Sequence, residues 1–330
     1  VAGVDARVRF NEGWTGDFQA VTSDTRRPDG QTSAGPAYRA FVTGVGRHYY
    51  YEAGFRDVSP GFVSELGFVP RRDIRAFNQY GELVFRPEND YIVSFGPRAF
   101  VGNTWSHDGT RVNWERSVGL EFRMQRQTSF GAWTVHRQEG FRLSDYAALA
   151  AARDLSYRYL WAFFDSKALS AVSVRAEMRF AGTAINYRPA AGHGPDVANR
   201  PFEGTFTMTM RPHDRLRGDT TYLITKLDDR ATGASILTSH ILRSKWSWQF
   251  TPALSLRGIL QWDAVVANAS LTSAAPARRF NGDLLMTYQI NPWTALHAGY
   301  NGNLRRTDGY EGLLNDSNQV FVKFAYLVRP

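Results

Sequence analysis

Apolar and polar side chains alternate through the last stretch of the chain, from Gln319 to Pro330. One face is apolar throughout and consists of Val320, Val322, Phe324, Tyr326 and Val328. The other face mixes apolar residues with Lys323 and Arg329. A period of two is typical of a β-strand, because successive side chains point to opposite faces. The apolar face of such a strand packs on a core in a soluble sandwich and meets lipid in an outer-membrane barrel.

The same alternation recurs along the whole chain and predicts about 17 strands, most of them about 10–14 residues long. In order they are Asp5–Phe10, Trp14–Ser23, Pro36–Val45, His48–Val58, Ile74–Arg86, Tyr91–Asn103, Arg111–Gln125, Ser129–Gln138, Leu155–Phe164, Leu169–Asn186, Phe202–Arg211, Arg215–Leu227, Ser235–Phe250, Leu254–Val266, Arg279–Ile290, Trp293–Leu304 and Gln319–Arg329. The faces are consistent from strand to strand, although Arg116 interrupts the apolar face of Arg111–Gln125.

Short and long connections alternate between these strands. The short turns are Asn11–Gly13, Gly46–Arg47, Pro87–Asp90, Arg126–Gln127, Ser166–Ala168, Pro212–Asp214, Thr251–Ala253 and Asn291–Pro292. The long connections are Asp24–Gly35, Ser59–Asp73, Gly140–Asp154, Tyr187–Pro201, Ala267–Arg278 and Arg305–Asn318. In outer-membrane barrels the short turns face the periplasm and the long loops face outside. We therefore expect the bacterial outer membrane of a Gram-negative cell as the location, in that orientation.

Composition excludes several other classes of protein. The mean hydropathy is −0.37 and no apolar run is long enough for a membrane-spanning helix. The net charge is +8, but the arginines are spread singly among acids, which argues against a nucleic-acid partner. Sandwich strands are usually only about 5–6 residues long, and no propeller repeat is present. The predicted fold class is all-β: an antiparallel transmembrane β-barrel of about 16–18 strands, forming one domain over residues 1–330.

The strand count raises the question of closure. Bacterial single-chain barrels have an even number of antiparallel strands, yet Asp5–Phe10 and Gln319–Arg329 would run in the same direction. We expect one or three further strands, supplied from sequence before Val1 or by a partner chain, for a total of about 18–20. The alternative is a miscount by one, with this chain closing on itself at about 16 strands.

One segment resembles a known family. Ser59-Pro-Gly-Phe-Val-Ser-Glu-Leu-Gly-Phe-Val-Pro-Arg-Arg-Asp-Ile-Arg75 is similar to the signature segment of a family of uncharacterised bacterial outer-membrane barrels. Asp5–Phe10, Thr22–Thr25 and Val320–Leu327 also resemble that family. The resemblance implies a barrel of unknown function that follows an N-terminal carbohydrate-binding-module-family-9-like domain. That module is absent from these residues, so its glycan binding is not transferred to them, and the resemblance implies no catalytic residues.

The candidate functional residues are charged side chains on the faces expected to line the lumen. They are Glu52, Arg56, Glu82, Glu115, Glu121, Arg123, Glu203, Arg211, Arg217, Asp219, Arg243, Arg257, Asp263 and Asp283. Both signs are present, so these residues could simply pair across strands, at no more than about 1 kcal/mol for each exposed pair. Alternatively they form a field or an arginine ladder that selects anionic or sugar solutes.

No enzymatic, metal or cofactor chemistry is predicted. The seven histidines are scattered without the spacing of a metal site. Ser239 and His240 are adjacent on one strand, so their side chains point to opposite faces and cannot form a catalytic couple. We expect no catalytic residues, no metal and no cofactor.

Two functions remain open, and an outer-membrane hydrolase is a less favoured third. The first is a porin-like channel or a solute-binding transport protein with a charged lumen. The second is a plugged or narrow structural barrel that anchors an outer-membrane or cell-surface assembly. The expected partners are outer-membrane lipid and lipopolysaccharide, a small solute or glycan, and a chain that completes the barrel or the assembly.

Overall fold

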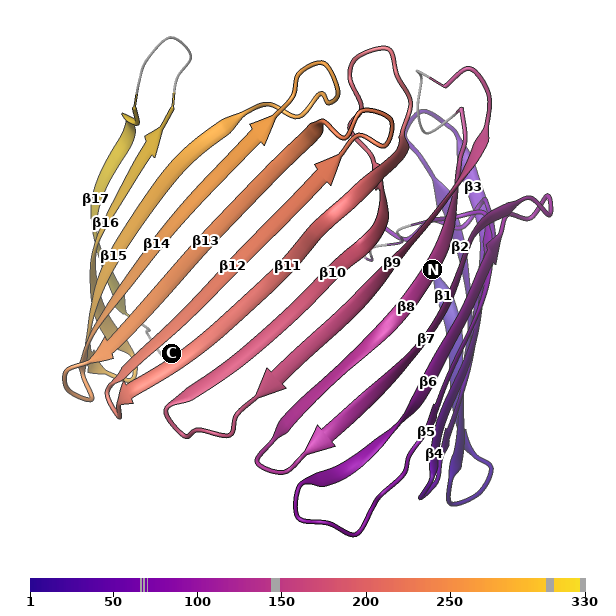
Figure 1. Cartoon of the computed structure of the whole chain (residues 1–330), viewed down its shortest axis with the longest axis horizontal. Helices are drawn as coiled ribbons and strands as arrows, with labels where there is room; N and C mark the ends of the chain where they lie inside the picture. The colour runs from indigo at the N-terminus through magenta and orange to yellow at the C-terminus, as the bar shows by residue number, and fades with distance from the viewer. Residues whose placement is uncertain (66, 68, 70, 144–148, 307–311, 327–330) are drawn as a thin grey trace. The chain divides into compact units, whose positions relative to one another are not determined.

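The computed structural model describes residues 1–65, 67, 69, 71–143, 149–306 and 312–326. These residues form one 17-stranded sheet, and each strand corresponds to one predicted from the sequence (Figure 1). The strands are β1 (Ala2–Arg9), β2 (Trp14–Arg26), β3 (Thr32–Val45), β4 (Tyr49–Val58), β5 (Ile74–Leu83), β6 (Ile92–Trp105), β7 (Arg111–Met124), β8 (Thr128–Phe141), β9 (Arg153–Ser166), β10 (Val172–Asn186), β11 (Asp196–His213), β12 (Leu216–Asp228), β13 (Ser235–Gln249), β14 (Leu254–Ala267), β15 (Ala277–Asn291), β16 (Thr294–Arg305) and β17 (Leu314–Tyr326). No helix within the described ranges is long and apolar enough to cross a membrane.

The chain divides into two compact units. The first comprises residues 1–124 and 131–160, and the second comprises residues 125–130 and 161–330. In the first unit each strand from β1 to β7 pairs antiparallel with the next along the chain. In the second unit the same is true from β10 to β17, and these strands lie side by side in Figure 1. Such a meander follows from alternating strand direction and short connections.

Several strands extend further into the long connections than we predicted. β11 begins at Asp196, so the predicted loop Tyr187–Pro201 is too long; β3 begins at Thr32 and β17 at Leu314. The added residues are mostly polar or small, so they pair through the backbone without showing an apolar alternation. The end of the predicted closing strand, which includes Val328 and Arg329, lies outside the described residues.

Large apolar side chains are exposed along one face of the sheet in each unit. Val118 of β7 is 56% exposed in the first unit, and Leu260 of β14 is 54% exposed in the second. Buried apolar clusters are small and lie towards strand ends, as with Val58, Phe62 and Ile74 in the first unit. A soluble protein rarely exposes apolar patches of more than a few hundred Å², so this face suits lipid.

The interruption at Arg116 has a local explanation. Its guanidinium donates hydrogen bonds to the carbonyl oxygens of Gly102 and Glu115 and to Oδ1 of Asn103, each at 2.7 Å. It also lies over the ring of Trp114, 5.5 Å from the centroid. A charged group on an apolar face is tolerated when its donors are satisfied in this way.

Candidate functional site

The register places the predicted charges on the face opposite the apolar one, which we call the polar face. In the first unit, cross-strand pairing puts six of the predicted residues on this one face: Glu52, Arg56, Glu82, Glu115, Glu121 and Arg123. In the second unit, the pairing puts seven more on the same face of their strands: Glu203, Arg217, Asp219, Arg243, Arg257, Asp263 and Asp283. Arg211 lies at a bulge between Met210 and His213, so the register does not fix its face.

In the first unit, Arg98 of β6 brings three of the predicted residues together. Its Nη2 lies 2.9 Å from Oε1 of Glu82 on β5, and its Nη1 forms an ion pair with Glu121 on β7. The side chains of Arg98 and both glutamates are only 11% exposed. Arg123 completes the group from the solvent side, 3.2 Å from Glu121 and 3.5 Å from Glu82, and is 48% exposed. We call these four residues the charged quartet; two positive and two negative charges leave it neutral.

Aromatic side chains pack around the charged quartet. The Tyr80 hydroxyl donates to Oε2 of Glu82 at 3.3 Å, and the Tyr80 ring stacks on Trp133 with centroids 6.4 Å apart. Farther along the polar face, Tyr157 donates to Glu139 at 2.9 Å. Trp133 and Tyr157 are both buried. This part of the polar face is therefore filled by side chains that fix one another.

Most other predicted charges pair locally. Arg137 Nε donates to Glu115 at 2.6 Å, and in the second unit Arg217 lies 2.9 Å from Asp219 on the same strand. Arg200 lies 3.3 Å from Glu203. Side-chain amides contact Asp263 and Asp283: Gln261 donates to Asp263 at 3.1 Å, and Asn301 donates to Asp283. Within the described ranges, no ion pair is formed by Arg56, Arg211, Arg243 or Arg257.

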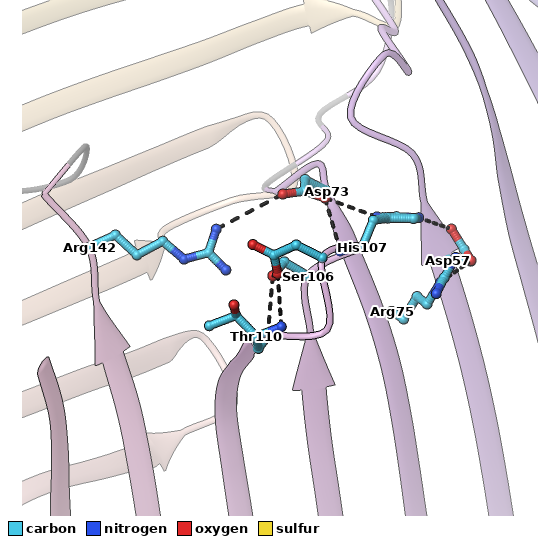
Figure 2. Close-up of polar contacts among 8 residues, drawn as sticks. Asp57, Asp73, Arg75, Ser106, His107, Thr110 and Arg142 are labelled. Carbon is cyan, nitrogen blue, oxygen red and sulfur yellow. Dashed lines mark hydrogen bonds and ion pairs between the residues drawn. The ribbon is translucent and has the colours of Figure 1, made fainter. Parts of the chain in front are cut away.

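A second polar cluster lies at the ends of the strands in the first unit, and the sequence did not predict it. Figure 2 shows the His107 ring between two carboxylates: Nε2 is 2.8 Å from Oδ1 of Asp57, and Nδ1 is 3.0 Å from Oδ1 of Asp73. Arg75 contacts Asp57 at 3.1 Å, and Arg142 lies 4.0 Å from Asp73. His107 thus joins the end of β4 and the start of β5 to the β6–β7 connection.

The β6–β7 connection is itself held by Asp108. The Ser106 hydroxyl donates to this carboxylate, and so does the backbone N–H of Thr110 at 2.8 Å. These hydrogen bonds, that of Ser106 foremost, lower the pKa of Asp108 to about 2. The turn that presents His107 is therefore braced by an ionised carboxylate at neutral pH.

Replacing His107 with alanine is expected to free the connection Ser59–Asp73. Losing a hydrogen bond to a charged group costs about 1.5 kcal/mol, so trypsin should cut after Arg71 or Arg72 about 10-fold faster. Mass spectrometry of the fragments measures this. His136→Ala is the matched control, because its exposed ring contacts Trp114 of β7. Equal acceleration in both variants would contradict the role of the His107 bridge.

Across the described residues, the other histidines do not join the His107 cluster, and His240 makes its own contact on the apolar face. Among the residues that the structure describes, no three His, Asp or Glu side chains are grouped to hold a metal ion. His240 lies on the apolar face, where the Tyr222 hydroxyl is 2.7 Å from its Nδ1. Ser239 pairs with Thr225 on the polar face, so Ser239 and His240 point apart.

Comparison with known proteins gives a likeness at the level of fold. The structure is similar to that of the FrpB iron transporter from Neisseria meningitidis (F3-3 variant), with a TM-score of 0.51 and 10% sequence identity. The match covers 98% of this chain and 64% of that chain, so this chain spans less than two thirds of the transporter's length. No family model and no curated protein sequence matches. The likeness shows the fold class alone: all-β, an antiparallel transmembrane β-barrel.

Proposed function

We propose that this chain is the barrel of a transport-type protein of the bacterial outer membrane, which conducts or binds a small hydrophilic solute. The observation that carries the proposal is the division of the strands into an exposed apolar face and a charged polar face. Lipid would cover the first and the second would line the lumen, with long connections outside and short turns in the periplasm. The fold likeness to a protein named as an iron transporter supports transport over enzymatic activity.

A structural barrel is the second candidate, and one observation favours it. Arg98, Trp133 and Tyr157 on the polar face are nearly or fully buried, as expected where side chains fill a lumen. A filled lumen would conduct little and would suit a barrel that anchors a surface assembly. The charged quartet would then serve stability rather than selectivity.

We further propose that an odd number of additional strands completes the barrel. The sheet has 17 strands, and closure of an antiparallel barrel needs an even number. Within its own unit β1 pairs with β2, and all of its residues are exposed; β17 likewise pairs with β16 and is exposed along almost its whole length. Unpaired backbone groups in lipid would cost several kcal/mol each, so upstream sequence or a partner chain would cover these edges. We likewise propose membership of the family that Ser59–Arg75 resembles, whose members have upstream sequence of this kind.

Single-channel recording of the full-length protein in planar bilayers tests the transport proposal. We expect a stable open-channel current whose anion preference falls when the exposed Arg243 is replaced by glutamate, because the polar face sets the local field. Leu242→Ala, one residue away on the apolar face, should leave the ion preference unchanged. Silence from protein that is demonstrably folded would reject the channel and favour the structural barrel.

A further inference from the structure

Two arginines lie directly opposite each other on the polar face of the first unit. The register pairs Arg39 of β3 with Arg56 of β4, and both side chains are exposed. Like charges in this arrangement are unfavourable unless something of opposite charge lies between or beside them. In the part of the chain that the structure describes, neither guanidinium forms an ion pair or a hydrogen bond.

The acids nearest to this pair along the strands are already engaged. Asp17 of β2 lies diagonally opposite Arg39 of β3, but Arg7 contacts its carboxylate at 2.6 Å. Glu52 is on the same strand and face as Arg56, about 13 Å along it, and accepts a hydrogen bond from the Tyr50 hydroxyl. Asp57, the neighbour of Arg56, points to the other face and is held by His107 and Arg75. The positive charge of the two arginines is therefore not neutralised locally.

A cavity of about 270 Å³ opens beside the arginine pair. Its lining on the polar face includes Arg39, Phe41, Glu52, Arg56, Tyr80 and Phe100, and Glu52 lies at the end away from the two arginines. The Arg39 guanidinium lies 5.6 Å from the centroid of the Phe41 ring, so one end of the cavity is cationic and its wall is aromatic. Pockets for drug-sized ligands usually hold about 300–1,000 Å³, which limits the occupant here to a small molecule.

We propose that Arg39 and Arg56 form a binding subsite for a small organic anion, with its carboxylate between the two guanidinium groups and its ring or chain against Phe41 and Phe100. Guanidinium groups match the geometry of a carboxylate, and an anion between them removes the repulsion across the strands. The inference deepens the proposed transport function, on which it rests for its place in the lumen. It specifies the chemical class of solute that the first unit would select.

Isothermal titration calorimetry with benzoate tests the subsite, using the folded full-length protein in detergent at low salt. Benzoate should bind, and neutral benzamide of the same shape should not. Arg39→Gln combined with Arg56→Gln should weaken benzoate binding about 10-fold or more, because both charged partners are lost. Added salt should also weaken it, because the arginines are exposed.

The matched control is Arg175→Gln. Arg175 is 55% exposed on the polar face of the second unit but already contacts Glu177 at 2.6 Å and Asp165 at 3.2 Å. Its loss should leave benzoate affinity unchanged. Removing repulsion should not destabilise the double variant; if it fails to fold, Arg56→Gln alone is used with the same expectation of weaker binding. Unchanged affinity in the folded arginine variants, equal loss in Arg175→Gln, or equal binding of benzamide would overturn the proposal.

Two further outcomes separate this inference from the function it rests on. Benzoate binding that depends on Arg39 and Arg56 in a protein without channel activity would reject transport and keep the subsite. Channel activity without any arginine-dependent benzoate binding would reject the subsite and keep transport.

Discussion

Replacing Arg98 with methionine is expected to lower the free energy of unfolding by about 3–5 kcal/mol. Glu82 and Glu121 both pair with Arg98 on the polar face, and all three side chains are only 11% exposed, whereas Arg123 reaches the two carboxylates from the solvent side. Without Arg98 the two carboxylates would remain close together with little solvent to screen them. Breaking a buried ion pair by removing one partner is costly because an uncompensated charge stays behind.

Arg123→Met is the matched control within the charged quartet. Arg123 contacts the same two glutamates but is 48% exposed, so its loss should cost at most about 1 kcal/mol. Glu82→Gln and Glu121→Gln added to Arg98→Met should recover much of the stability, because the only charge left in the group is then that of Arg123, which is 48% exposed. Denaturant unfolding in lipid vesicles measures each variant. If Arg98→Met and Arg123→Met lower the free energy of unfolding by similar amounts, burial does not decide how much each arginine of the charged quartet stabilises the protein.

The sequence predicted the number and faces of the strands because that information is local. Side-chain direction alternates with a period of two whatever the neighbouring strand is, so Met208 and Thr207 are assigned to opposite faces without knowledge of their partners. The ends of strands were less predictable. Residues such as Asp196 and Leu314 pair through the backbone beyond the alternating stretch, and no side-chain pattern marks them.

Contacts between side chains depend on register, and the sequence specifies register unevenly. The short turn at Gly46–Arg47 fixes which residue of β3 faces which residue of β4, so the pairing of Arg39 with Arg56 was within reach of the sequence. Arg98 instead meets Glu82 across the less regular connection Pro87–Asp90 and Glu121 across the β6–β7 connection, where the register shifts between Thr104 and Trp105. His107 joins connections far apart in sequence, which alternation within strands does not reveal.

Replacing Met208 with arginine is expected to destabilise the protein by about 2–4 kcal/mol in lipid. Met208 lies within β11, where it pairs with Val174 and Thr220 on the apolar face. An arginine there would have to reach the membrane surface or remain in hydrocarbon, and the cost is greatest near the middle of the bilayer. Unfolding by denaturant in lipid vesicles gives the free energy directly.

The control is an arginine on the polar face of the same strand, and the register decides which position is suitable. Thr207 pairs with Arg175, so an arginine there would add repulsion between like charges to any effect of the face. Thr205 pairs with Glu177, so Thr205→Arg places the new charge beside an acid and should cost less than about 1 kcal/mol. Equal losses for Met208→Arg and Thr205→Arg would mean that the two faces meet the same solvent, which no membrane barrel allows. If only Met208→Arg lowers the free energy of unfolding, the apolar face of β11 lies in lipid.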